Sequence, residues 1–253
     1  MIHVHKHPIC EYDEDRNAII RAADFLERCL PEKCVITFFR KELEQFVKDH
    51  ALSVIGYLHS EVLDIPIYDY SQGEKHICLT MPFSTAPGAA GTIEELRAMG
   101  CQKFVICGGA GALVEGSKVG EIIIPTSAVR DEGTSYHYIE ASREIACHEV
   151  AMEAAVSTLT EMGVPFVLGK TWTTDAMYRE TPDMIALRRN EGCITVEMET
   201  AAFFAVSKFY SIPLVQLLYA GDDVSGSAWD SRNWNTQKNI RANLIDCSIK
   251  IIE

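Results

Sequence analysis

The stretch Val196–Thr200 places Glu197 and Glu199 on either side of Met198, and the apolar run Ala201–Val206 follows at once. A buried carboxylate is costly unless something pairs with it, so acids at the start of a buried helix need an explanation. One explanation is helix capping, which stabilises a helix by about 0.3–1 kcal/mol. The other is a polyol site, because a carboxylate accepts two vicinal hydroxyls and the methionine offers an apolar face to a sugar ring. Spacing alone leaves both explanations open.

A second pair of acids, Asp222 and Asp223, follows the apolar run Leu214–Ala220, which has the composition of a buried strand. A carboxylate at the carboxyl end of a strand lies where open α/β sheets bind their ligands. The next stretch is polar and aromatic, as a lid would be, and contains Arg232. This arginine is either a functional partner of the acids or the surface partner of Asp230.

Gly108 and Gly109 open a glycine-rich stretch directly after the apolar segment Phe104–Cys107. A strand followed by a glycine-rich turn is a place where backbone N–H groups can bind an anion. Such turns also simply connect elements, so the signal is weak by itself. The chain has no Gly-x-Gly-x-x-Gly, and a dinucleotide-binding fold is therefore not supported.

Two further loops contain side chains suited to a small-molecule pocket. The segment Glu132–Tyr138 includes Thr134 and His137, and an isolated loop histidine is more typical of hydrogen bonding than of base catalysis. Further on, Met177 and Tyr178 offer a soft and an aromatic surface on which a planar ring could stack.

Three histidines, His3, His5 and His7, alternate with other residues near the start of the chain. Alternation would place them on one face of a strand, as a metal site requires. No acid or cysteine is spaced to complete such a site, so we expect a flexible, hydrated arm instead. We expect no metal ion and no organic cofactor.

The apolar spacing predicts alternating helices and strands, which is typical of a single α/β domain over residues 1–253. The segment Ser84–Gly91 has the composition of a turn. We expect helices over Asn17–Leu30, Arg40–Val47, Thr92–Gly100, Ile145–Met162 and Gln237–Ile252. We expect strands over Val35–Phe39, Ile77–Phe83, Phe104–Cys107, Gly120–Pro125, Val167–Thr174 and Leu214–Ala220.

Composition narrows the class of protein. Of the 253 residues 47% are hydrophobic, which suits a sizeable core, and the net charge of −13 argues against nucleic acid or an acidic membrane as partner. Nine cysteines are scattered without a Cys-x-x-Cys pair, as in free thiols of a reducing cytoplasm. The chain shows neither the apolar core of a signal peptide nor a run of ~20 apolar residues that would span a membrane.

Taken together, these motifs resemble the nucleoside phosphorylase superfamily, which includes uridine phosphorylases, hexameric purine nucleoside phosphorylases and methylthioadenosine nucleosidases. The resemblance covers most of the chain. It rests on motifs that follow one another in the family's order: Gly91–Leu96, Gly108–Leu113, Glu132–Tyr138, Thr174–Tyr178, Val196–Glu199 and Gly221–Asp223.

The resemblance implies a mixed central sheet that is partly closed into a barrel and flanked by helices. It implies that Asp222, helped by Arg232, protonates the leaving base. It also implies an N-terminal histidine that reaches the ribose of a neighbouring subunit, in a homo-oligomer of two to six chains. The substrate-binding residues would be Glu197, Met198, Glu199, Met177, Tyr178, Thr134, His137 and Asp223, and the phosphate-binding residues Gly108, Gly109 and Arg40.

The chain departs from its relatives where they bind phosphate. Phosphorylases of this group have an arginine just before the glycine-rich stretch and a Ser or Thr within it, whereas this chain has Ile106 and Gly109. Losing the arginine removes a bidentate, charge-assisted contact. Arg40, Arg130 or an arginine of a neighbouring subunit would have to replace it. In addition, Glu42 lies near the position of the water-activating glutamate of the nucleosidases.

Members of the family also differ in the residues that bind the base. Uridine phosphorylases read uracil with a Gln and an Arg, and the matching residues here are Thr181 and Asp183, so a purine is expected. The overall pattern favours phosphorolysis of a purine nucleoside, with inorganic phosphate as co-substrate. The alternatives are hydrolysis by water and a nucleoside-binding homologue with little catalysis.

Overall fold

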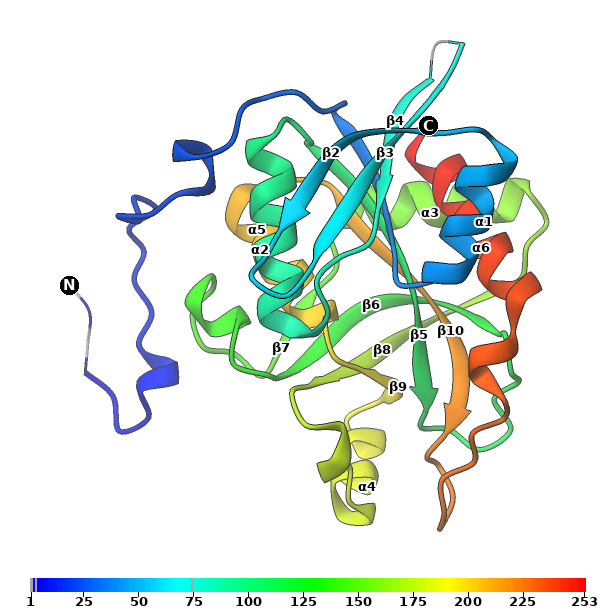
Figure 1. Ribbon diagram of the computed structural model, residues 1–253. Helices are drawn as coiled ribbons and strands as arrows, with labels where there is room; N and C mark the ends of the chain where they lie inside the picture. Colours follow the sequence, from blue (N-terminus) through cyan, green and yellow to red (C-terminus); the bar gives the residue numbers. More distant parts are fainter. Residues whose placement is uncertain (1, 3, 74) are drawn as a thin grey trace.

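One large mixed sheet organises the chain in the computed structural model, which describes residues 2, 4–73 and 75–253 (Figure 1). Its strands are β1 (Lys33–Thr37), β2 (Ser53–His59), β3 (Asp64–Gln72), β4 (Lys75–Thr80), β5 (Lys103–Ala112), β6 (Ile122–Asp131), β7 (Glu144–Ala146), β8 (Phe166–Thr174), β9 (Cys193–Glu197) and β10 (Leu214–Asp223). The α-helices of the described residues are α1 (Arg40–Asp49), α2 (Thr85–Ala98), α3 (Glu149–Glu161), α4 (Pro182–Asn190), α5 (Thr200–Tyr210) and α6 (Lys238–Ile252).

Part of this sheet closes on itself. Strand β5 pairs with β10 on one side and with β9 on the other, and the circuit β5–β10–β6–β8–β9 returns to β5. From β5 the sheet also extends outward through β1, β4, β3 and β2. The expected mixed sheet, partly closed into a barrel and flanked by helices, is confirmed.

Helices cover both faces of the sheet (Figure 1). Helices α1, α3 and α6 pack together on one side, α2 and α5 pack together on the other, and α4 lies against β9. Strands covered on both faces are apolar throughout rather than alternating. The central strands are buried in this way: Val35, Val105 and Val215 lie in register on β1, β5 and β10, and each is at most 1% exposed.

The glycine-rich stretch is strand rather than turn, which corrects the sequence prediction. Gly108 and Gly109 pair with Leu218 and Tyr219 inside the β5–β10 ladder. A Cβ atom at Gly108 would lie 3.1 Å from the Phe38 ring, and one at Gly109 would lie 3.1 Å from the Tyr219 ring. The glycines therefore allow aromatic rings to pack directly on the strand.

The predicted helix Asn17–Leu30 is also wrong. This segment contains only a 3₁₀ turn at Ala22–Asp24, and Ile19 and Phe25 are 100% and 74% exposed. Leu26 and Leu30 pack on the core while Ile19 and Phe25 do not, so the apolar side chains share no continuous buried face and a helix is not stabilised.

Two other helix starts differ from the prediction. Helix α2 begins at Thr85 rather than Thr92, because its small residues Ala86 and Ala89 are buried and allow close packing. The predicted helix from Ile145 begins only at Glu149, after the short strand β7. In the described part of the chain, no helix is both long and apolar enough to cross a membrane.

Candidate active site

Glu197 ends strand β9 and is buried at the start of helix α5. Its carboxylate accepts hydrogen bonds from Thr173 Oγ1 at 2.6 Å and from the N–H groups of Glu199 and Thr200 at 2.7 and 2.6 Å. Burial raises the pKa of Glu197, and these hydrogen bonds oppose the increase. The capping explanation therefore describes the geometry of Glu197.

Glu199 is placed differently, at the point where helices α2 and α5 begin. Its Oε1 atom accepts a hydrogen bond from the backbone N–H of Thr85, the first residue of α2, at 2.8 Å. Burial, with a contribution from the charge of Glu197, raises the pKa of Glu199 to about 7. One carboxylate thus lies beside two helix N-termini, where backbone dipoles favour negative charge.

Asp222 lies near the end of β10, and β5 separates β10 from β9, the strand that leads to the two glutamates. A Cβ atom at Gly111 of β5 would lie 3.1 Å from Val196 Cγ1 and 3.6 Å from Asp222 Oδ1. The side chains of Val196 and Asp222 therefore both lie next to Gly111. Gly111 also pairs with Val196 across β5 and β9. The structure brings Asp222 beside the strand that precedes Glu199. That the two carboxylates face one cavity stays a prediction.

The stretch after β10 covers Asp222. The indole N–H of Trp229 donates to Asp222 Oδ2 at 2.7 Å. Arg232 donates to the backbone carbonyls of Asp222 and Ser117 at 2.9 and 2.6 Å, and its Nη1 lies 3.8 Å from Asp223 Oδ2. The guanidinium of Arg232 therefore holds the β10 end through main-chain oxygens, and Asp230 accepts only from its backbone N–H.

Glu180 is a candidate that was not among the predicted site residues. It is half-buried after the turn Met177–Arg179, and burial together with the charge of Asp222 raises its pKa to about 7. Two acids from distant segments thus interact at the end of β10. Raised pKa values in acids that meet in this way are typical of functional sites. The only sequence signal was an acid next to the expected base pocket.

The expected phosphate region contains aromatic and acidic side chains. Tyr219 is fully buried against Gly109, and its hydroxyl donates to Trp234 O at 2.8 Å and accepts from Arg241 Nε at 3.1 Å. Glu42 is buried nearby: its Oε2 lies 3.8 Å from Arg241 Nη1 and accepts no hydrogen bond from the described residues.

The arginines considered for phosphate are engaged elsewhere. Arg40 is exposed on α1 and its Nε donates to Glu44 at 2.9 Å, in a surface pair. The three guanidinium nitrogens of Arg130 all donate within the following loop, among others to Ser135 Oγ at 2.8 Å and Ser142 Oγ at 2.7 Å. Phosphate binding by Gly108, Gly109 and Arg40 stays a prediction.

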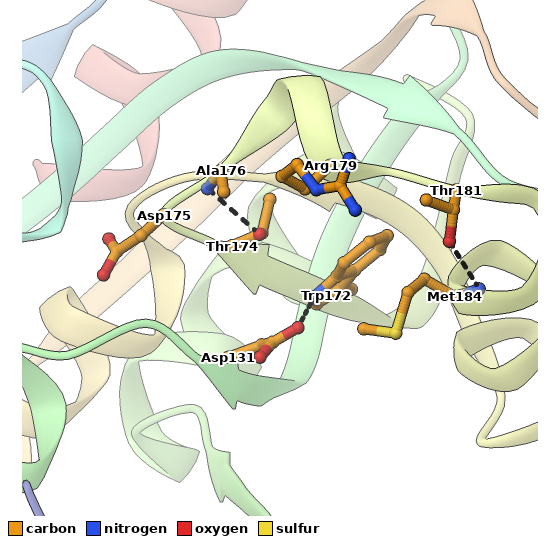
Figure 2. Close-up of a pocket in the computed structure, with 8 residues that line it drawn as sticks. All are labelled: Asp131, Trp172, Thr174, Asp175, Ala176, Arg179, Thr181 and Met184. Atoms are coloured by element: carbon orange, nitrogen blue, oxygen red, sulfur yellow. Dashed lines mark hydrogen bonds between the residues drawn. The ribbon is translucent and has the colours of Figure 1, made fainter.

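A pocket of about 320 Å³ opens beside the carboxyl end of β8 (Figure 2). Asp131 accepts hydrogen bonds there from Trp172 Nε1 at 2.9 Å and from Arg188 Nη2 at 2.7 Å. The lining residues are Asp131, Trp172, Thr174, Asp175, Ala176, Arg179, Thr181 and Met184. Met177 and Tyr178 do not line it and are 48% and 93% exposed, so their stacking role stays a prediction.

The loop with Thr134 and His137 lies against the turn after β8 that contains Asp175. The N–H of Gly133 donates to Asp175 Oδ2 at 2.8 Å, and the N–H of Thr134 donates to Glu132 Oε2 at 2.6 Å. Thr134 is half-buried and His137 is exposed. The preceding N-terminal segment reaches this loop as well, because Ile9 Cδ1 would lie 3.3 Å from a Cβ at Gly133.

The N-terminal histidines lie outside this arrangement. The rings of His5 and His7 are 5.8 Å apart, and both residues are exposed. His3 lies outside the described residues.

Comparison with known proteins assigns this chain to one family. The chain belongs to the phosphorylase superfamily, whose family model matches residues 32–252. Relatives by sequence include a guanosine phosphorylase and purine nucleoside phosphorylases, and structures of the same fold include an AMP nucleosidase. The family resemblance expected from the sequence motifs is confirmed.

Individual relatives are more distant. A guanosine phosphorylase of Halorubrum lacusprofundi is 29% identical over 122 residues, which cover 48% of this chain and 51% of the relative. The crystal structure of a uridine phosphorylase from Vibrio fischeri superposes with a TM-score of 0.73 at 18% identity, covering 88% of this chain and 92% of that one. An AMP nucleosidase from Bacteroides thetaiotaomicron gives 0.68 at 19% identity, covering 85% and 87%. These structures share the fold, and the matched part spans about half the length of the guanosine phosphorylase.

Proposed function

We propose that this protein cleaves the N-glycosidic bond of a purine nucleoside. The observation that supports this most is the placement of Asp222 beside Val196, at the start of the segment leading to Glu199. Glu199 would accept hydrogen bonds from the ribose hydroxyls, which requires its carboxylate form. Asp222 would give a proton to the leaving base, a step typically worth about 10²–10⁴-fold.

Neighbouring groups fit these roles. Burial and the charge of Asp222 raise the pKa of Glu180 to about 7, which suits a group that would return a proton to Asp222 after each turnover. Trp229 would hold the carboxyl group of Asp222 in place and limit the access of solvent to it. Thr181 caps α4 by accepting from Met184 N at 3.4 Å, and Asp183 is exposed, which agrees with a purine rather than a pyrimidine substrate.

We infer that water is the attacking nucleophile. Tyr219 occupies the space next to Gly109, where a phosphorylase would have a Ser or Thr, and Ile106 replaces the arginine. Arg40 and Arg130 are engaged in other contacts. Glu42, near the position of the nucleosidase glutamate, is buried, and its Oε2 faces Arg241 at 3.8 Å but accepts no hydrogen bond from the described residues, as suits a residue that would bind and activate water.

The experiment follows adenosine, inosine and guanosine with and without inorganic phosphate and identifies the sugar product. Free ribose at a rate independent of phosphate is expected, and Glu42→Gln should lower that rate by about 10²-fold or more. Glu44→Gln, on the exposed side of the same helix, is the matched control and should leave it unchanged. Circular dichroism confirms that the variants are folded.

The second candidate is phosphorolysis to free base and ribose 1-phosphate, which the similarity to guanosine and purine nucleoside phosphorylases favours. Ribose 1-phosphate formed only in the presence of phosphate would establish it and reject water as the nucleophile. Binding of nucleosides without any turnover would instead identify a binding homologue.

We further propose that the protein acts in the cytoplasm as a homo-oligomer. The apolar side chains of Ile19 and Phe25 are exposed on the N-terminal segment, which suits burial against another copy. Light scattering on the purified protein tests this: a dimer to hexamer is expected, and a monomer at micromolar concentration would reject it.

A further inference from the structure

Three cysteines from separate elements converge in the core. Cys34 and Cys78 are register partners on the parallel strands β1 and β4, and Cys101 lies in the connection between α2 and β5. Their Sγ atoms all lie within 4.8 Å of one another, and the Cys78 and Cys101 sulfurs are 3.6 Å apart. All three residues are 0% exposed and their thiols are free.

The cluster is remote from the candidate active site. Cys34 lies level with Phe104 and Leu214 at the amino ends of β5 and β10, whereas Asp222 lies at the other end of β10. Eight residues of strand at about 3.3 Å each separate the two levels by roughly 26 Å. The cysteines therefore take no part in the proposed cleavage reaction.

The spacing of the sulfurs matches that of ligands around one metal ion. With metal–sulfur bonds of about 2.3 Å, three thiolates in a plane around an ion lie about 4 Å from one another. Among the described residues, no other group of three His, Cys, Asp or Glu side chains brings its ligand atoms this close together. The remaining buried cysteines, such as Cys193 and Cys247, do not join the group.

We propose that Cys34, Cys78 and Cys101 form a three-coordinate site for a soft, thiophilic cation, Cu⁺. Thiolates select Cu⁺ and Zn²⁺, and structural zinc takes four ligands. Here the described residues supply three, and burial leaves no place for a solvent ligand. Each thiol that binds as thiolate releases its proton to solvent.

The cluster has a defined position in the fold. Lys33 and Lys103 are register partners at the starts of β1 and β5, one residue from Cys34 and two from Cys101 in the sequence, so the cluster lies at the amino end of these strands. The segment before β1 is bonded to the connection that holds Cys101, because the N–H groups of Cys29 and Leu30 both donate to Met99 O, at 2.8 and 2.9 Å.

The test uses the reduced, full-length protein under anaerobic conditions, loaded with Cu⁺ and challenged with a Cu⁺ chelator such as bicinchoninate. One ion per chain should be retained, with three sulfur ligands by X-ray absorption. Cys78→Ser and Cys101→Ser should weaken Cu⁺ binding by more than about 100-fold, because even outer partners of a metal site cost 10–100-fold. Cys193→Ser and Cys247→Ser, which also replace buried thiols, should not.

Several results would overturn the proposal. These are a wild type that loses its Cu⁺ to the chelator, equal losses in the control variants, or retention of Zn²⁺ but not Cu⁺. A Cys78–Cys101 disulfide in freshly isolated protein would likewise reject the site in favour of a redox pair. Circular dichroism and nucleoside cleavage, both expected to be unchanged in Cys78→Ser, separate loss of the site from loss of the fold.

Discussion

Glu199→Gln should make the protein more stable at alkaline pH while it damages the candidate site. Burial and the charge of Glu197 raise the pKa of Glu199 from 4.5 to about 7. The folded state therefore holds the proton more tightly than the unfolded state, and this contribution to stability is lost as pH rises to 7 and above. The glutamine has no charge to bury, and its carbonyl oxygen can still accept from Thr85.

The expected gain in the free energy of unfolding follows from the pKa shift of Glu199. At 1.36 kcal/mol per pKa unit, an increase from 4.5 to about 7 corresponds to about 3 kcal/mol at pH 8. Below pH 4.5 the glutamate is protonated in both states, so the variant and the wild type should have nearly the same free energy of unfolding. The stabilisation by the substitution should grow steadily between these limits.

Urea denaturation at pH 5 and pH 8, at one fixed protein concentration, measures this difference. Glu44→Gln is the control: its side chain is exposed and paired with Arg40, so the free energy of unfolding should change by less than about 0.5 kcal/mol at either pH. If Glu199→Gln showed the same change in stability at both pH values, the carboxyl group would not be strained by its burial and the reasoning would fail.

Other variants test separate features. Asp222→Asn should lower kcat by about 10²–10⁴-fold while nucleoside binding, measured by calorimetry, persists; loss of binding with kcat preserved would contradict the acid role. Trp229→Phe removes the hydrogen bond to Asp222 and should lower kcat/KM by about 10–100-fold, whereas an unchanged value would show that the contact is incidental. Gly120→Ala, at φ +86° with a Cβ 2.2 Å from Ile240 Cδ1, should lower Tm more than Gly163→Ala, at φ +66° with no atom within 4 Å. Equal shifts in Tm would show that the Ile240 side chain adapts without cost.

The apolar pattern predicted part of the sheet, with β2, β3, β7 and β9 missed. The strands ending at Thr37 and Asp223 were expected within a few residues of their observed bounds, because uninterrupted apolar runs are typical of strands covered on both faces. The family motifs, which follow in a fixed order along the chain, also predicted the partly closed sheet. Apolar runs and motif order are both properties of the sequence itself, so these features could be predicted without the structure.

Helix prediction failed where tertiary contact was decisive. Asn17–Leu30 has helical apolar spacing, but of its large apolar side chains only Leu26 and Leu30 pack on the core, so no continuous apolar face is buried and the segment stays irregular apart from one 3₁₀ turn. The small residues around Ala86 suggested a turn, yet they form the first turns of α2 because they allow close packing. In both segments the local sequence indicates a conformation, but packing against neighbouring elements determines whether a helix forms.

For the candidate site, too, some features could be predicted from the sequence and others required the tertiary structure. The sequence alone identified Glu197, Glu199 and Asp222 as acids that buried segments would have to accommodate. Which glutamate caps the helix was settled only by the fold, since Glu197 accepts the N–H groups of α5 and Glu199 turns to Thr85. The meeting of Glu180 with Asp222 and of Tyr219 with Gly109 also required the closed sheet, because contacts between residues distant in sequence depend on strand order and register, which local patterns do not encode.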